Sequence, residues 1–296
     1  MARWLLTGGG GFVGAAILRR LLAEGEQVVA VTSAAPAART SDGAEWRQLD
    51  LLRAGEADIA RLVEEAGVTP CIHAAWYTNH SDYLVADVNR DWLEASVRLA
   101  EGFAAGGGQR FLGLGTCLEY DQAADDGHFS ESTTPLRPET LYARCKAELF
   151  ERLDGRSGFA WARLFYIYGP GDRDGRLIPY ILSSLGRGER VGPRFGGLRR
   201  DYIHADDLAE QLVAIGRSGL EGAVNSATGE ADKVGDIFRI AAELFGRPDL
   251  ADINDRVDPD QAERIEADMS RFRSEIGEPA RRPLRDGLAG LIGAAR

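Results

Sequence analysis

The sequence of 296 residues lacks any apolar run that approaches the roughly 20 residues of a membrane-spanning helix. Its N-terminal apolar stretch, between Arg3 and the first glycine, is too short for the core of a signal peptide. The three cysteines are odd in number and lack the spacing of a metal site or a disulfide framework, which indicates a reducing compartment. The four histidines are scattered. We therefore expect a cytoplasmic protein with no membrane partner and no metal site.

Acidic residues outnumber basic ones, and the formal net charge is −11 at pH 7. That charge argues against a nucleic-acid partner. The balance reverses in one segment, since between Arg187 and Arg200 five arginines accompany a single glutamate. Such a run is either a binding site for an anion or a solvated basic loop, and the sequence leaves both open.

Short apolar runs alternate with amphipathic helical segments over the first part of the chain. Helices are expected at 56–66, 82–105 and 140–153, and the run "FAWARLFYIYG" is expected to form one strand. This alternation is typical of an α/β fold with a Rossmann-type doubly wound parallel sheet. After Gly169, glycine, proline and arginine become frequent, which indicates a smaller, mixed C-terminal substrate domain. We expect a dinucleotide-binding domain of residues 1–165 and 203–228, and a substrate-binding domain of residues 166–202 and 229–296.

The motif "TGGGGFVG" joins the first expected strand to the first expected helix. In a dinucleotide site of this kind, Gly8 allows a tight turn, Gly11 lets backbone N–H groups approach a pyrophosphate, and Gly14 permits close helix–strand packing. The N-terminus of the helix, with Phe12 and Val13, then faces the anion. The position of the motif, after a strand and at the start of a helix, predicts a bound dinucleotide.

The segment "YARCK" places Tyr142 and Lys146 four residues apart, hence on one face of a helix. A neighbouring ammonium and an oxidised nicotinamide both favour the phenolate form of a tyrosine and lower its pKa. A tyrosine and a lysine at this spacing occur frequently by chance, but Thr116 strengthens the interpretation that they are catalytic. Its hydroxyl follows a buried strand, and ligands of a doubly wound sheet lie beyond the carboxyl ends of the strands. We expect Thr116, Tyr142 and Lys146 to be the catalytic residues.

Together these motifs resemble those of the extended short-chain dehydrogenase/reductase family, the NAD(P)-dependent nucleotide-sugar epimerases, dehydratases and reductases. The resemblance runs in order from "TGGGGFVG" through "DL", "HAA", Thr116, "YARCK" and "RLFYIYGPGD" to "RRDYIHADDLAE". It implies that Tyr142 and Lys146 also contact the cofactor. The further cofactor contacts that it implies are Asp50, Leu51, Ala74, Ala75, Phe165 and Ile167.

The resemblance also implies contacts with the substrate. Arg200 would meet the diphosphate of a nucleotide sugar, a role that bidentate arginine–phosphate contacts suit. Arg176 and Thr116 would be further substrate contacts. Members of the family often have an asparagine where Tyr166 stands, so the chain departs from the pattern at one contact with the diphosphate. Four residues near the motifs are expected to be structural: Cys71, His73, Cys145 and His204.

The residues after Thr116 bear on the reaction. Sugar 4,6-dehydratases of the family resemble one another in an acidic pair directly after the threonine, or at least a glutamate two residues after it. Cys117 and Leu118 hold these positions here, and neither can act as a carboxylate acid or base. Glu119 comes one residue later, and in an extended chain it would point to the opposite side from Leu118. The stretch argues against a dehydratase, and we expect no chemical role for Cys117 and Glu119.

The remaining reactions are epimerisation, with a retained NAD, and ketone reduction, which consumes NADPH. An NAD site usually has an acid about two dozen residues past the first glycine, where it binds the ribose hydroxyls. Thr32 and Ser33 stand there instead, and with nearby Arg39 they could receive a 2′-phosphate. The alternative is that they are polar loop residues. We expect NADP(H) to be preferred, with NAD(H) as the alternative.

The sequence thus predicts an NADPH-dependent ketoreductase of a nucleoside-diphosphate-activated keto-deoxyhexose, with the ketone at the 4-position. The alternatives are an NDP-sugar 4-epimerase with retained NAD and an extended reductase of a non-sugar carbonyl. A cofactor-sensing regulator is disfavoured, because such proteins typically lose the tyrosine or the lysine. Segment 82–105 and the Tyr142 helix correspond to helices that form a four-helix dimer interface in the resembling family, which implies a homodimer.

Overall fold

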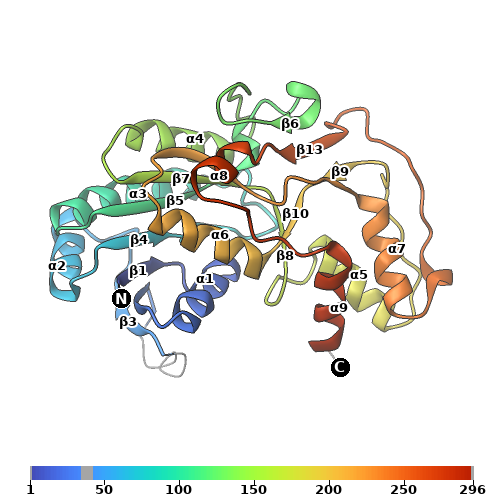
Figure 1. Ribbon diagram of the computed structural model, residues 1–296, viewed down its shortest axis with the longest axis horizontal. Helices are drawn as coiled ribbons and strands as arrows, with labels where there is room; N and C mark the ends of the chain where they lie inside the picture. The colour runs from blue at the N-terminus through green and yellow to red at the C-terminus, as the bar shows by residue number, and fades with distance from the viewer. Residues whose placement is uncertain (1, 35–42, 295–296) are drawn as a thin grey trace. The chain divides into compact units, whose positions relative to one another are not determined.

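The computed structural model describes residues 2–34 and 43–294 (Figure 1). The chain divides into two compact units. Unit 1 contains Met1–Glu119, Leu136–Arg163 and Ala209–Val224. Unit 2 contains Tyr120–Pro135, Leu164–Leu208 and Asn225–Arg296. Within the described ranges, none of the helices has both the length and the apolar character that a membrane crossing requires.

Unit 1 is built on a seven-stranded sheet with the order β11-β7-β5-β4-β1-β2-β3 (Figure 1). The pairs from β3 to β5 are parallel, and Leu5, for example, lies beside Val29 on one side and Cys71 on the other. The central strands are apolar almost throughout, because helices cover both of their faces. The strands are β1 (Arg3–Thr7), β2 (Gln27–Thr32), β3 (Glu45–Gln48), β4 (Pro70–His73), β5 (Arg110–Thr116), β7 (Phe159–Leu164) and β11 (Gly222–Ser226).

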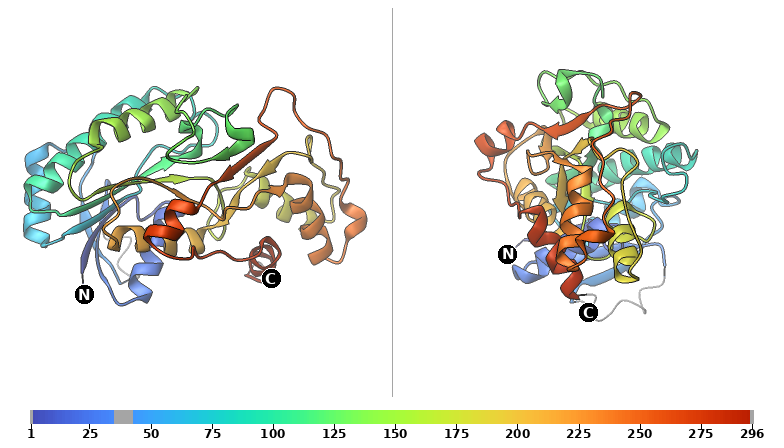
Figure 2. Two further views of the ribbon diagram at one scale, coloured as in Figure 1. Left: turned by 45° about the horizontal axis from the view of Figure 1, so that its top comes forward. Right: turned by 90° about the vertical axis from the view of Figure 1, so that its right-hand side faces the viewer.

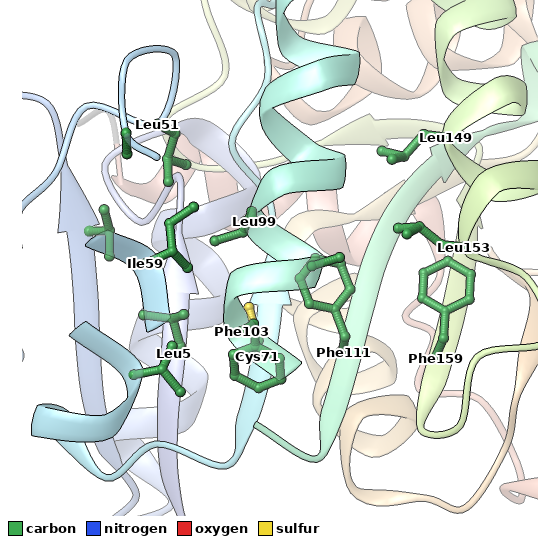
Figure 3. Close-up of a cluster of buried hydrophobic side chains, with 14 of the residues drawn as sticks. Leu5, Leu51, Ile59, Cys71, Leu99, Phe103, Phe111, Leu149, Leu153 and Phe159 are labelled. Atoms are coloured by element: carbon green, nitrogen blue, oxygen red, sulfur yellow. The ribbon is translucent and has the colours of Figure 1, made fainter. Parts of the chain in front are cut away.

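Two groups of helices cover the sheet of unit 1 (Figure 2). Helices α2, α3 and α4 pack on the face that carries Leu5 and Phe111, and their side chains form one hydrophobic core with it (Figure 3). Helices α1 and α6 lie on the opposite face, where Trp4 packs against Gly216 and Arg20 forms an ion pair with Glu210. The helices are α1 (Phe12–Ala23), α2 (Glu56–Ala66), α3 (Val88–Ala105), α4 (Leu141–Leu153) and α6 (Ala205–Arg217).

Unit 2 has two small sheets. In one, β8 and β10 are parallel; in the other, with the order β12-β9-β13-β6, the pair β12–β9 is antiparallel and the others are parallel. Helices α5, α7 and α9 enclose a separate core around Tyr168, Phe238 and Leu288 (Figure 2). The elements are β6 (His128–Phe129), β8 (Tyr166–Tyr168), α5 (Leu177–Gly186), β9 (Arg199–Arg200), β10 (Tyr202–His204), β12 (Asp232–Lys233), α7 (Val234–Leu244), β13 (Arg264–Ala267), α8 (Ser270–Glu275) and α9 (Leu284–Ala294).

The predicted fold class is confirmed: the chain has an α/β fold with a Rossmann-type parallel sheet and a smaller, mixed second sheet. The prediction of one strand in "FAWARLFYIYG" was wrong, because β7 ends at Leu164 and the chain then joins β10 as β8. Unit 2 also contains Tyr120–Pro135, which the sequence analysis placed in the dinucleotide-binding domain. The assignment of a ligand to each domain stays a prediction.

Asp201 is a buried hydrogen-bond acceptor that joins three segments of unit 2, and it is fully shielded from solvent. Its Oδ1 accepts from the backbone N–H and the hydroxyl of Thr228, at 2.9 and 2.6 Å. Its Oδ2 accepts from the N–H groups of Gly229 and Ala267, at 2.9 and 3.3 Å. The carboxylate therefore needs both of its oxygens.

Asp201→Asn should destabilise the protein by about 1–3 kcal/mol, because an amide nitrogen would face donors that then lack an acceptor. Urea unfolding followed by circular dichroism measures the effect. The matched control is Asp260→Asn, an exposed aspartate of the same unit, which should leave the midpoint unchanged. Equal midpoints for the two variants would contradict the assigned role of Asp201.

Candidate active site

The glycine-rich turn links β1 to α1 with very little space around it. Gly8 has φ +72°, and a Cβ there would lie 2.6 Å from the backbone of Ala74 and Ala75. A Cβ at Gly14 would overlap the carbonyl oxygen of Gly8. Only glycine fits these two positions, so the tight turn and the close helix packing expected from the sequence both have a physical basis.

The same turn has what a dinucleotide needs. Gly11 is the N-cap of α1, and its N–H donates to the Gly8 carbonyl at 2.9 Å. The first N–H groups of a helix have no acceptor inside it, and at α1 these begin with Phe12 and Val13. They point toward the helix N-terminus, where an anion is favoured. The residues present therefore fit the diphosphate of a dinucleotide.

A directed chain of hydrogen bonds fixes the carboxyl ends of β1 and β4. The N–H of Ala75 donates to Thr7 Oγ1 at 3.2 Å, and Thr7 Oγ1 lies 2.7 Å from His73 Nδ1. His73 Nε2 lies 2.8 Å from Ser96 Oγ, which itself donates to the Trp92 carbonyl. The Ser96 hydroxyl oxygen thus accepts a hydrogen bond from His73 Nε2, and the Thr7 hydroxyl donates one to His73 Nδ1. Burial, and then Lys146, lower the pKa of His73 to about 3, so its ring is neutral.

The proposed catalytic residues gather at the ends of β5 and the start of α4. Thr140 caps α4 by accepting from the N–H of Ala143, and Tyr142 and Lys146 follow on one face of that helix. Lys146 Nζ lies 5.9 Å from the centroid of the Tyr142 ring and donates to the carbonyl of Leu114 at 2.8 Å. Leu114 is two residues before Thr116 in β5, so these three side chains come from adjoining elements.

Lys146 is buried against aromatic rings. Its Nζ lies 3.6 Å from the centroid of a Trp76 ring and 5.8 Å from that of Trp161. Burial lowers the pKa of Lys146 to about 7, although the charge of Glu119 acts in the opposite direction. A lysine with a pKa near neutrality can hold or release a proton within the working range of an enzyme.

Trp76 is a site residue that the sequence analysis missed. Its ring stands edge-on to Tyr142 at 6.3 Å, and its Nε1 donates to Asn89 Oδ1 at 2.8 Å. The Asn89 amide donates in turn to the carbonyls of Tyr83 and Ala86, at 2.7 and 2.8 Å. A large aromatic residue directly after the two alanines at the end of β4 was the available signal.

Glu119 differs from its expected placement. The sequence analysis treated residues 117–119 as extended chain, but Cys117–Glu119 form a 3₁₀ turn, η2, directly after β5. The turn directs the Glu119 carboxylate inward, where it accepts from the N–H of Thr116 at 2.8 Å and from Arg163 Nε at 2.8 Å. Cys117 is buried as well, at 4% exposed. The expectation from strand alternation was wrong because the strand ends at Thr116.

The residues expected around the adenosine end lie in short turns of unit 1. Thr32 ends β2, and its Oγ1 accepts from the N–H of Ala34 at 3.3 Å. Ser33 follows, and its carbonyl accepts from Gln48. Asp50 Oδ1 accepts from the N–H of Leu52, and Leu51 is buried. Arg39 lies outside the described residues.

The remaining predicted residues belong to unit 2. Phe165 is buried, and Ile167 pairs with Ile203 between β8 and β10. The Tyr166 ring lies 5.8 Å from the guanidinium of Arg200. Arg176 is the N-cap of α5.

Arg200 is 5% exposed, and its guanidinium is held by backbone carbonyls. Its Nη1 donates to the carbonyls of Arg199, Ala262 and Glu263, and its Nη2 donates to Gln261 Oε1 at 3.3 Å. The other four arginines of the segment from Arg187 to Arg200 also contact the protein. Arg187 pairs with Glu189, and Arg190 and Arg199 donate to the carbonyls of Asp249 and Ala231. The guanidinium of Arg194 lies 4.9 Å from the centroid of the Phe195 ring. Within the described residues, no group of three or more histidine, cysteine or acidic side chains could hold a metal ion.

Comparison with known proteins gives a consistent result. The family model for the NAD dependent epimerase/dehydratase family matches residues 4–227. The chain is 26% identical over 310 residues to the dTDP-6-deoxy-L-talose 4-dehydrogenase (NAD(P)(+)) of Kitasatospora kifunensis, across 98% of this chain and 94% of the relative. It is 27% identical over 310 residues to the dTDP-glucose 4,6-dehydratase of Streptomyces griseus, across 97% and 92%. The solved structure of MoeE5 in complex with UDP-glucose and NAD has a TM-score of 0.80 and 26% identity, with 100% of this chain and 99% of that chain covered.

Proposed function

Since the chain belongs to the NAD dependent epimerase/dehydratase family of extended short-chain dehydrogenases/reductases, we propose that it is an NADPH-dependent ketoreductase. Its substrate is a nucleoside-diphosphate-activated deoxyhexose with a ketone at the 4-position. The observation that carries this proposal is the site around Lys146, which shares a helix face with Tyr142 and donates to β5 two residues before Thr116. One relative is a 4-dehydrogenase of a 6-deoxy sugar nucleotide, and such a dehydrogenation in reverse is the reduction of a 4-ketone.

A bound nicotinamide cofactor supplies the hydride for this reduction, and the turn from Gly8 to Val13 together with Lys146 would hold it. Thr116 Oγ1 accepts from the N–H of Leu118 at 3.3 Å, which leaves its hydroxyl hydrogen to donate to the carbonyl oxygen of the substrate. Tyr142 donates its proton to the same oxygen as general acid when negative charge develops there. The Lys146 ammonium stabilises the phenolate that remains.

We assign the substrate diphosphate to Arg200 and Arg176. Two parallel N–H donors of an arginine suit phosphate oxygens. Arg200 Nη1 donates to the carbonyls of residues 199, 262 and 263, so a diphosphate bound through Nη1 would compete with these bonds. A cytoplasmic location is part of the proposal, supported by three cysteines that are all free and buried.

The reductase is tested by NADPH oxidation against a panel of nucleotide-sugar ketones. Tyr142→Phe should reduce turnover by about 10²–10⁴-fold, because the general acid is lost, while NADPH still binds. Thr116→Val should reduce turnover less. Cys117→Ala is the control and should stay within a few-fold of the wild type, because that thiol has no chemical role. Near-normal turnover of Tyr142→Phe, or an inactive but folded Cys117→Ala, would overturn the mechanism.

Two alternatives remain and can be separated. An NDP-sugar 4-epimerase would keep NAD through purification and interconvert epimers without net oxidation of added cofactor; the bound NAD of MoeE5 favours it. A reductase of a non-sugar carbonyl would gain no thermal stability from a nucleoside diphosphate. The sugar enzymes should show a raised Tm with that ligand.

NADPH should bind more tightly than NADH, because Thr32 and Ser33 replace the acid that usually binds the ribose hydroxyls. Fluorescence titration of the two cofactors measures the preference. Thr32→Asp should weaken NADPH binding selectively, since a carboxylate would repel the 2′-phosphate. Affinity for NADH equal to or above that for NADPH in the wild type would favour the epimerase instead.

We further propose a symmetric homodimer formed through α3 and α4, which pack side by side in unit 1. Light scattering at micromolar concentration should give twice the mass of one chain. Ala147 is half-buried on α4, so Ala147→Arg should yield monomers by placing a charge in the interface. Ala57→Arg, at an exposed position of α2, is the matched control. A monomeric wild type would refute the assembly.

A further inference from the structure

Glu119 and Arg163 form an ion pair inside unit 1, next to the backbone of Thr116. They are 0% and 2% exposed, and Arg163 Nε donates to Glu119 Oε2 at 2.8 Å. Trp161 Nε1 also donates to the carboxylate, 3.1 Å from one oxygen and 3.2 Å from the other. The N–H of Thr116 completes the set at 2.8 Å from Oε1. The carboxylate thus ties the end of β5 to β7.

Two glycines of β5 provide the space for this arrangement. A Cβ at Gly115 would overlap both the Trp161 indole nitrogen and Glu119 Oε1, and a Cβ at Gly113 would lie 2.5 Å from the Trp161 ring. Glycine inside a strand weakens it and often marks the close approach of another group. A buried ion pair is also costly to desolvate, and apolar residues of similar volume are often at least as stabilising. Stability alone therefore does not account for this pair.

Lys146 adjoins the same arrangement. Its Nζ donates to the carbonyl of Leu114, the residue between the two glycines, and lies 5.8 Å from the centroid of Trp161. Trp161 therefore adjoins both charged groups: its ring lies near the Lys146 ammonium, and its Nε1 donates to the Glu119 carboxylate. The charge of Glu119 raises the pKa of Lys146 against the effect of burial.

Among the titratable groups around Lys146, Glu119 raises the pKa of the lysine most. His73 of β4 is neutral, since its pKa is about 3, and burial raises the pKa of the Cys145 thiol. The Tyr142 ring of α4 lies 5.9 Å from Lys146 Nζ, and Arg163 of β7 is a cation paired with Glu119. Among these groups, Glu119 has the largest effect in favour of the ammonium form of Lys146, and Cys145 has a smaller effect in the same direction.

We propose that Glu119 is a positioning residue that fixes the backbone of Thr116 and keeps Lys146 in its ammonium form. It acts through these two residues and touches no substrate itself. This inference rests on the site proposed above but not on the identity of the substrate. It assigns a role to the acid of the stretch "GTCLEY" for which the sequence analysis expected none.

The ionisation of Lys146 can be measured without any substrate. The chain contains two lysines, Lys146 and Lys233, so protein labelled with ¹³C-lysine gives two Cε signals to follow against pH by NMR. Lys233→Arg assigns them. In Glu119→Gln, the midpoint of the Lys146 signal should fall by about 1 pH unit or more, because the opposite charge is removed. The control is Glu151→Gln, at an exposed acid of α4, the helix that carries Lys146; it should leave the Lys146 midpoint unchanged.

Glu119→Asp separates the two roles and also serves if Glu119→Gln does not fold. It keeps the charge, so the Lys146 midpoint should stay near that of the wild type. Its shorter side chain withdraws the acceptor from Thr116, whose amide hydrogen should exchange with solvent about tenfold faster. An unchanged midpoint in folded Glu119→Gln, or unchanged exchange at Thr116 in Glu119→Asp, would overturn the inference. Failure to find a ketone substrate would leave both measurements valid and count against the proposed function alone.

Discussion

Close approach of backbone at the carboxyl ends of β1 and β4 is the constraint on which the glycine-rich turn depends. Gly8 lies so near to Ala74 and Ala75 that a Cβ could not be placed between them. The same edge is tied together by hydrogen bonds from Ala75 to Thr7 and on to His73. A parallel sheet brings these strand ends to one edge, and the helices on its faces then deliver their first residues to it. The turn before α1 owes its position to this geometry.

Much of the architecture and part of the site could be predicted because they depend on local patterns. The glycine spacing from Gly8 to Gly14 encodes the turn, and the four-residue spacing of Tyr142 and Lys146 encodes a shared helix face. Each of these patterns lies within a few consecutive residues. They required no knowledge of which distant segments meet.

The features that were missed depend on distant contacts. In the 3₁₀ turn at Cys117–Glu119, the Glu119 carboxylate accepts hydrogen bonds from the Thr116 N–H and from Arg163. Arg163 comes from another strand, β7. Trp76 lies beneath Lys146 only because β4 and α4 converge on that edge. The division of "FAWARLFYIYG" into β7 and β8 likewise follows from pairing with β10, a partner far along the chain. A sequence pattern within one segment does not indicate which distant segments it contacts.

The inward turn of Glu119 also bears on which reactions this site could support. Dehydration of a sugar requires a base beside the ketone in addition to the acid that serves the carbonyl oxygen. Cys117 and Leu118 supply no carboxylate, and both oxygens of Glu119 already accept hydrogen bonds, from Thr116, Trp161 and Arg163. The Glu119 carboxylate is thus engaged in hydrogen bonds and an ion pair inside unit 1. In the proposed mechanism Tyr142 is the proton donor at the carbonyl, and the absence of a carboxylate at residues 117 and 118 fits reduction or epimerisation better than elimination of water.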